Sequence, residues 1–151
     1  MTDTFDPLKL ENQLCFPLYV CAKEVIRRYK PILDELDLTY TQYITMLVLW
    51  EHQLISIKSL GKILFLDSGT LTPVVKSLEK KGFVVRERSR EDERVVNVIL
   101  TDKGKSLRTE ALCIPEKMSR CIELSSEDAA SLYMILNKLS LNFVELPVET
   151  E

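Results

Sequence analysis

The sequence predicts a mainly α-helical protein with one small β-hairpin, in the order of a winged helix-turn-helix. Apolar residues recur at three- and four-residue spacing along most of the 151 residues, as on the buried faces of about six helices. A β-like pattern replaces this spacing only at residues 83–100. With 46% apolar and 28% charged residues, the composition is typical of one folded domain and excludes a disordered chain.

The first predicted helix covers Leu14–Tyr29, where apolar residues repeat on one face. We expect Pro31 to end this helix or to begin a short new turn, because proline removes a backbone donor. Thr39 and Gln42 have the spacing of a capping box, so they predict a second helix at about Thr41–Glu51.

Two short helices follow, each with its own capping residue. Ser56 is expected to cap a third helix, and Asp67 or Ser68 to begin a fourth. Pro73 falls in or just after the first turn of that fourth helix, where a missing N–H costs little. Gly82 is expected to end it, since glycine is favoured just beyond a helix.

The β-hairpin is predicted from two short β-like runs, Phe83–Arg88 and Val95–Leu100, around the polar loop Ser89–Arg94. A long helix is then expected from Thr101–Asp102 to about residue 118, with a kink at Pro115. The last helix begins after Ser125, whose spacing to Asp128 resembles a capping box.

The charge is unevenly distributed along the chain. The net charge is −3, but the segment from Lys58 to Arg108 carries +5 and the remainder −8. A basic centre between acidic ends is typical of a DNA-reading module attached to another element. A solvated basic surface is the alternative interpretation of the charge alone.

The helix-turn-helix pattern predicts which residues meet double-stranded DNA. In such modules the second helix enters the major groove and the hairpin reaches a neighbouring groove or the backbone. The expected DNA-binding residues are Asp67, Ser68, Gly69, Thr70, Thr72, Pro73, Lys76, Arg86, Asp92 and Arg94. The alternative is that the hydroxyl residues of this set only cap and solvate a surface helix.

Other classes of protein are not indicated. No apolar run is long enough for a membrane span and the first residues are not a signal peptide, so we expect a cytoplasmic protein with four thiols. His52 is the only histidine, and neither a Cys-x-x-Cys pair nor a glycine-rich phosphate loop occurs. We therefore expect no metal site, no cofactor and no enzymatic activity.

The segment LDSGTLTPVVKSLEKKGFVVRERSREDERVVNVILTDKG resembles the DNA-binding core of the MarR family of bacterial regulators, and Asp92-Glu93-Arg94 matches that family's wing signature. The resemblance implies a homodimeric regulator of transcription that binds a pseudo-palindromic operator. It implies a single domain, with the winged helix-turn-helix at about 40–108 and dimerisation helices at about 8–30 and 110–144. Arg94 is then expected to reach a minor groove while Asp92 holds it in place.

A narrower resemblance concerns the segments Glu11–Tyr19, Tyr29–Pro31, Leu38–Tyr43 and Trp50–Glu51. They are similar to the OhrR branch, the organic-hydroperoxide sensors. The resemblance implies that Cys15 is the peroxide-reactive thiol, that Tyr29 and Tyr40 reach it across the dimer interface, and that Tyr19 lies close by.

The chemistry of peroxides agrees with this assignment. Only a thiolate attacks the O–O bond, and phenolic O–H donors stabilise the anion. The apolar residues around Cys15 would favour organic peroxides over hydrogen peroxide. Pro17 suggests that the helix begins at Phe16–Pro17 with Cys15 as the capping residue. The alternative role of Cys15 is that of an inert core thiol. The alternative functions of the protein are a regulator that responds to a small phenolic or other ligand, and a thiol peroxidase.

The fate of an oxidised Cys15 stays open. Cys121 is the candidate resolving thiol, since two-cysteine members of this branch hold one in a similar region of the other subunit. Cys113 is a weaker candidate, and Cys21 is expected to be a small core residue. A one-cysteine route would use a small cellular thiol, a cyclic sulfenamide or overoxidation instead.

Overall fold

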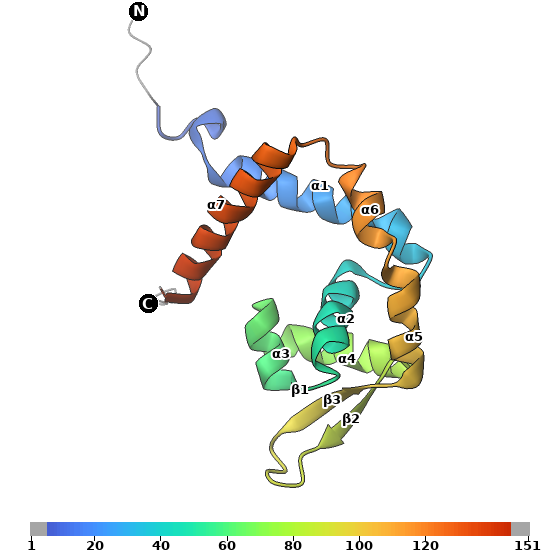
Figure 1. Ribbon diagram of the computed structural model, residues 1–151. Coiled ribbons are helices and arrows are strands. Elements are labelled where there is room, and N and C mark those ends of the chain that lie inside the picture. The colour runs from blue at the N-terminus through green and yellow to red at the C-terminus, as the bar shows by residue number, and fades with distance from the viewer. Residues whose placement is uncertain (1–5, 146–151) are drawn as a thin grey trace, which may run out of the picture. The chain divides into compact units, whose positions relative to one another are not determined.

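The computed structural model describes residues 6–145 of the chain (Figure 1). The chain divides into two compact units, residues 1–118 and 119–151, and each is described by itself. The first contains a short 3-10 helix, Leu10–Asn12, followed in order by α1 (Cys15–Asp34), α2 (Tyr40–His52), β1 (Leu54–Ser56), α3 (Ile57–Leu64), α4 (Ser68–Lys80), β2 (Val84–Arg88), β3 (Val96–Leu100), α5 (Asp102–Ala111) and α6 (Ile114–Ser119). The second unit contains α7, Ser126–Glu145.

Helix α1 begins within one or two residues of its expected starts and extends further than expected at its C-terminal end. It begins at Cys15 instead of the residue after it, and Pro17 occupies the first turn, where backbone N–H groups have no helical partner. The expectation that Pro31 ends the helix is wrong, because α1 continues to Asp34. Burial of Leu33 anchors this last turn, and an ion pair of 2.7 Å between Lys30 and Asp34 spans the proline.

The predicted caps of α2, α3 and α4 are confirmed. The Thr39 hydroxyl accepts a hydrogen bond from the Gln42 N–H at 3.3 Å, and the Gln42 side chain accepts one from the Thr39 N–H at 3.0 Å. Ser56 caps α3 and Asp67 caps α4 through their side-chain oxygens. Each cap satisfies a donor that the helix itself leaves without a partner.

Gly82 ends α4, as predicted. Its φ of 79° is in the left-handed region, which glycine adopts without steric cost. Its N–H donates to the Glu79 carbonyl at 2.9 Å, and the Phe83 N–H donates to the Leu78 carbonyl at 3.1 Å. This pair of bonds is a Schellman motif, and it turns the chain from the helix directly into β2.

The β-hairpin is confirmed, but it belongs to a three-stranded antiparallel sheet in the order β1-β3-β2. Val84 pairs with Leu100 and Arg88 with Val96 in the hairpin, while Ile55 of β1 pairs with Val98. The sequence did not predict β1, because a three-residue strand is too short to show a period and depends on its partner for its hydrogen bonds.

The long helix expected after Thr101 is two helices, α5 and α6, so the described residues form seven α-helices. The interruption lies at residues 112–113, ahead of Pro115. Pro115 has no N–H to donate to the carbonyl of Ala111, where α5 ends. The predicted start of α7 is confirmed, since the Ser125 hydroxyl accepts a hydrogen bond from the Asp128 N–H at 3.0 Å.

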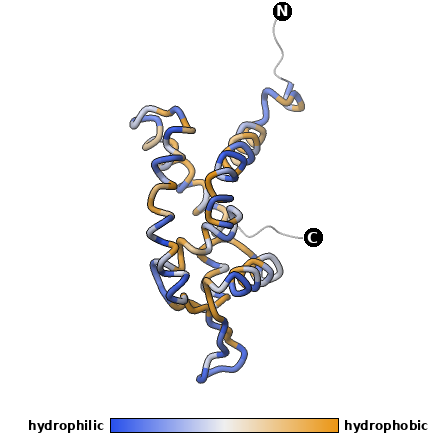
Figure 2. Tube along the Cα trace, turned by 90° about the vertical axis from the view of Figure 1, so that its right-hand side faces the viewer, coloured by the Kyte–Doolittle hydropathy of each residue, from blue (hydrophilic) through white to orange (hydrophobic). Residues whose placement is uncertain are grey.

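The core of the first unit lies around α2, which packs against α1 and, on its other sides, against α3, α4, the sheet and α5 (Figure 1). The indole N–H of Trp50 donates to the Gly104 carbonyl at 2.8 Å and ties α2 to α5. The tube in Figure 2 is hydrophilic at the tip of the hairpin. The fully buried aliphatic side chains are Leu33, Met46, Leu49, Leu60, Leu71, Val75, Leu78, Val84, Val98 and Ile114.

The two terminal helices expose much of their apolar surface. On α7 none of the described residues is buried, and on α1 only Leu33 is. The exposed large apolar residues of these helices are Phe16, Tyr19, Val20, Ile26, Leu132, Tyr133, Met134, Ile135, Leu136, Leu141 and Phe143. Within residues 6–145, no helix combines the length and the apolar character that crossing a membrane requires.

Candidate DNA interface and thiol site

Helices α3 and α4 form the predicted helix-turn-helix, joined by the tight turn Phe65–Asp67. Phe65 follows the last residue of α3 and has a φ of 55°, in the left-handed region, so the helix ends there. A Cβ atom on Gly61 would lie 2.7 Å from the Leu66 carbonyl oxygen, so the turn closes against α3 only because this residue is glycine. Gly61 was not among the expected functional residues, although a glycine inside an amphipathic helix is a signal of close packing.

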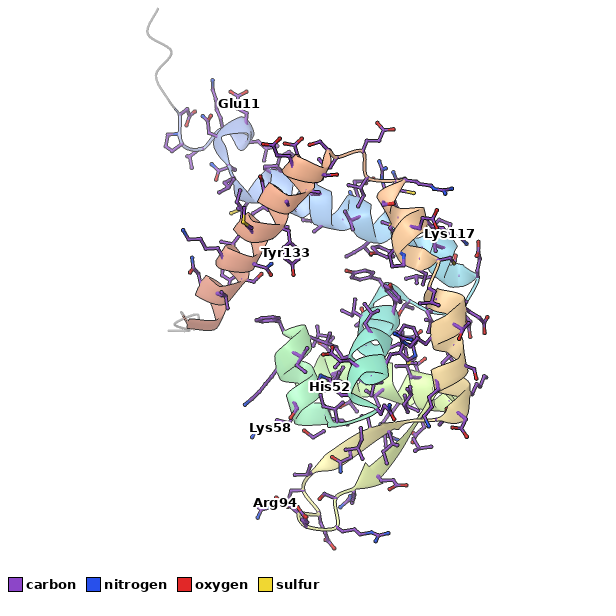
Figure 3. All side chains as sticks on the ribbon, viewed as in Figure 1. Glu11, His52, Lys58, Arg94, Lys117 and Tyr133 are labelled. Atoms are coloured by element: carbon purple, nitrogen blue, oxygen red, sulfur yellow. The ribbon has the colours of Figure 1, made fainter. Side chains whose placement is uncertain are left out.

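The first two turns of α4 present short side chains to solvent. Ser68, Gly69, Thr70, Pro73 and Lys76 are exposed and Thr72 is half-buried. The structure therefore brings together the residues predicted to meet the major groove. Figure 3 shows Lys58 on α3, which adds an exposed basic residue near the start of this module.

Asp67 supports α4 from its N-terminus. Its carboxylate accepts hydrogen bonds from the Thr70 N–H at 2.9 Å and the Thr70 hydroxyl at 2.8 Å. These bonds to Thr70 lower the pKa of Asp67 below its ordinary range. The carboxylate thus holds Thr70 in place.

The wing presents Arg94 at the tip of the hairpin (Figure 3). This side chain is 94% exposed. The Asp92 carboxylate accepts a hydrogen bond from the Arg94 N–H at 3.0 Å and lies 3.5 Å from the Arg94 Nε. The expected contact between Asp92 and Arg94 is therefore present.

Arg86 is directed away from the wing tip and onto α4. Its Nε donates to Glu79 Oε2 at 2.8 Å, and its Nη2 lies 2.7 Å from the same oxygen. The hydrogen bond from Arg86 lowers the pKa of Glu79. The pair joins α4, which we call the recognition helix, to the wing. No sequence signal indicated Glu79 as the partner of Arg86.

The candidate sensor thiol lies at the first position of α1. Cys15 is exposed, and Tyr19 lies one helical turn further along the same helix. Tyr19 is 62% exposed, and the Lys23 ammonium lies 5.9 Å from the centre of its ring. The structure thus brings Cys15 and Tyr19 near each other, as expected.

Tyr29 and Tyr40 meet at the other end of α1. Their ring centroids are 4.9 Å apart, and Tyr43 lies 5.7 Å from Tyr29. Burial raises the pKa of the Tyr29 phenol, and the neighbouring Tyr40 raises it further. The protonated phenol can act as a hydrogen-bond donor. The sequence analysis assigned Tyr43 to the second helix but not to this cluster.

Cys15 and Tyr29 do not meet within one chain. Both lie on the uninterrupted helix α1, fourteen residues apart. A rise of about 1.5 Å per residue separates their Cα atoms by about 21 Å along the helix axis. The thiol and the tyrosine cluster are thus far apart within one chain.

The other cysteines lie in different environments. The expectation that Cys21 is a core residue is wrong for the single chain, where it is exposed on α1. Cys113 is exposed between α5 and α6, and its thiol donates to the Glu110 carbonyl at 3.4 Å. Cys121 is half-buried in the second unit, before α7. Across the described ranges no cluster of His, Cys, Asp and Glu is suited to a metal ion.

A model of the transcriptional regulator SarA/Rot family matches residues 27–111, more than half of the chain. The chain is 46% identical over 143 residues to the organic hydroperoxide resistance transcriptional regulator of Bacillus subtilis, covering 92% of this chain and 97% of that protein.

Solved structures of AbfR from Staphylococcus epidermidis are also similar. The reduced, DNA-bound form is 32% identical with a TM-score of 0.78, covering 90% of this chain and 93% of that one. The overoxidised, DNA-bound form is 34% identical with a TM-score of 0.72, covering 87% and 93%. The disulfide form is 34% identical with a TM-score of 0.62, covering 91% and 93%.

The relatives named above are regulators of transcription and not enzymes. The winged helix-turn-helix fold described above agrees with this family. The chain belongs to the SarA/Rot family of transcriptional regulators and is an OhrR-like member of the MarR-type winged-helix proteins.

Proposed function

We propose that this regulator is a homodimeric repressor that releases its operator when an organic hydroperoxide oxidises Cys15. The observation that carries the proposal is the separation of Cys15 from Tyr29 along one straight helix. Only a second chain can bring a phenolic donor of the tyrosine cluster to the thiol. The exposed apolar faces of α1 and α7 support such a pairing, since burying them together stabilises a dimer.

The proposed DNA contacts follow from the exposed side chains. Ser68, Gly69, Thr70, Thr72, Pro73 and Lys76 of α4 meet the major groove, and Arg94 enters a minor groove. Asp67, Arg86 and Asp92 position these groups through the contacts described above. Two copies related by a two-fold axis would read a pseudo-palindromic operator with half-sites about 34–36 Å apart.

The proposed sensing step is a two-electron oxidation. The Cys15 thiolate attacks one peroxide oxygen, the O–O bond breaks, and the leaving alkoxide takes up a proton to become an alcohol. Cys15 becomes a sulfenic acid. The partner's tyrosine O–H groups would stabilise the thiolate before this step, and the loss of these hydrogen bonds would shift α1 and the spacing of the recognition helices.

We further propose Cys121 of the other subunit as the thiol that resolves the sulfenic acid, with water as the leaving group. AbfR supports a disulfide as the resolved state, because it is bound to DNA both when reduced and when overoxidised and has also been solved with a disulfide. Overoxidation is therefore the weaker candidate for the released state. A bacterial regulator of this kind works in the cytoplasm, to which we assign the chain.

The test measures binding to a duplex selected from random DNA by the reduced protein, before and after treatment with cumene hydroperoxide. Wild type and the matched control Cys21→Ser should release the duplex, whereas Cys15→Ser should hold it. Release by Cys15→Ser would contradict the redox proposal and favour a small-molecule ligand. On a non-reducing gel, a crosslinked dimer that Cys121→Ser abolishes would support the disulfide, and its persistence in that variant would exclude Cys121.

A further inference from the structure

Gln42 is a buried polar side chain that joins the start of α2 to the end of α4. It is 5% exposed. Its Oε1 accepts hydrogen bonds from the Thr39 N–H at 3.0 Å and the Lys81 ammonium at 3.1 Å, and its Nε2 donates to the Ser77 hydroxyl at 2.9 Å. The Thr39 N–H and the ammonium are donors only, which determines the orientation of the amide.

The first side of this network holds the turn that carries Tyr40. Gln42 and Thr39 form the capping box of α2, and Tyr40 is the first residue of that helix, packed on Tyr29. A displacement of Tyr40 therefore moves the same backbone turn to which Gln42 belongs.

The second side holds the recognition helix. Ser77 lies in the last turns of α4, and Lys81 directly follows that helix. The Lys81 ammonium also donates to the Asp37 carbonyl and lies 3.2 Å from the Asp37 carboxylate, in the turn between α1 and α2. Gln42 thus connects the start of α2, through its bonds to Thr39, with the C-terminal part of α4, through Ser77 and Lys81.

Moving one end of this network without the other has a cost, because a buried amide that loses a partner has a large desolvation penalty. Among the described residues no buried side-chain nitrogen or oxygen lacks a hydrogen bond, and both the oxygen and the nitrogen of the Gln42 amide are satisfied within this network.

We propose that Gln42 is a positioning residue that couples Tyr40 to the recognition helix, so that a shift of Tyr40 after oxidation of Cys15 moves α4. The inference rests on the proposed function, which supplies the oxidation. Because neither Gln42 nor Ser77 lies on the exposed first turns of α4, the coupling and the DNA contacts are carried by different residues.

The experiment compares the operator Kd of the oxidised and reduced full-length protein, expressed as a ratio, in wild type, Ser77→Ala and Ser77→Thr. Cumene hydroperoxide is the oxidant. Ser77→Ala removes the hydroxyl that Gln42 contacts, and we expect its ratio to fall roughly threefold to tenfold below that of wild type. Ser77→Thr keeps the hydroxyl and should restore the ratio. The rate of Cys15 oxidation should be the same in all three proteins.

The possible failures are distinguishable. A wild-type ratio of one would overturn the proposed function and this inference with it. A wild-type ratio well above one together with an unchanged ratio in Ser77→Ala would overturn only the coupling. Equal losses of affinity in both redox states of Ser77→Ala would show that the contact is merely structural, and would also overturn it.

Discussion

The Glu79 carboxylate accepts hydrogen bonds from both the backbone N–H and the guanidinium of Arg86, at 3.1 and 2.8 Å. Glu79 lies on the recognition helix and Arg86 on the first strand of the wing. This double contact sets the position of the wing relative to the helix. In the proposed complex the two elements enter different grooves of one duplex, so their spacing matters for binding.

Replacing Arg86 with lysine should therefore weaken binding to the operator. Lysine keeps the charge but cannot reproduce the planar, two-point contact with Glu79. We expect a loss of about threefold to tenfold in operator affinity with less than about 1 kcal/mol lost from the free energy of unfolding. Fluorescence anisotropy and urea denaturation measure the two effects. Arg88→Lys, two residues along the same strand, should bind like wild type; an equal loss there would contradict the role of the Glu79 contact.

Replacing Arg94 with alanine should weaken operator binding by about tenfold or more, because a groove contact from an arginine contributes about 1–3 kcal/mol. The slope of log affinity against log salt should also fall by about one, if Arg94 neutralises one phosphate. Arg108→Ala on α5 removes the same charge outside the wing and is the control. Equal affinities of Arg94→Ala and wild type would refute the groove contact, and the rate of Cys15 oxidation should not change in either variant.

Removing the hydroxyl of Tyr29 should slow the oxidation of Cys15. Tyr29→Phe keeps the ring contact with Tyr40 but loses the O–H that we propose as a donor to the partner's thiolate. A hydrogen bond to a charged group contributes about 1.5–3 kcal/mol, so we expect a decrease of about tenfold or more in the rate with cumene hydroperoxide. Stopped-flow measurement of thiol loss gives this rate. Tyr43→Phe is the matched control from the same cluster, and a wild-type rate in Tyr29→Phe would contradict the assignment.

The tyrosine cluster should make stability depend on pH in the alkaline range. Burial raises the pKa of both Tyr29 and Tyr43, so the folded state holds these protons more tightly than the unfolded state, where the pKa is about 10. The contribution of these two phenols to the free energy of unfolding is fully present below about pH 10. It is lost as the pH rises through the higher pKa values of the folded state. Urea denaturation should show a steeper fall above about pH 10 in wild type than in the Tyr29→Phe/Tyr43→Phe variant. Identical pH profiles would contradict the buried phenols.

Placing a methyl group on Gly61 should disturb the helix-turn-helix. The new Cβ would meet the backbone carbonyl of Leu66 at 2.7 Å, and a backbone atom cannot move aside as a flexible side chain can. We expect Gly61→Ala to lower the free energy of unfolding by about 1–3 kcal/mol, as overpacking does. Lys62→Ala at the next, exposed position should stay within about 0.5 kcal/mol of wild type. Equal stabilities of the two variants would show that the turn is not closely packed against α3.

Local features of the chain could be predicted from the sequence. Thr39, Ser56, Asp67 and Ser125 cap the helices they were expected to cap, and Gly82 ends α4, because capping depends on residues at most a few positions apart. The hairpin and its charged tip follow from a local change of period. For the same reason the residues of the recognition helix could be identified before the fold was known.

Contacts between distant segments were decided only by the tertiary structure. β1 exists through its pairing with β3, Pro31 is accommodated by the burial of Leu33, and Gln42 and Glu79 find partners elsewhere in the fold. The resemblance of the sequence to the OhrR branch predicted that Cys15, Tyr29 and Tyr40 belong to one sensor. The tertiary structure decided that α1 is unbroken between Cys15 and Tyr29, and a rigid helix with a rise of about 1.5 Å per residue holds these two residues apart within one chain.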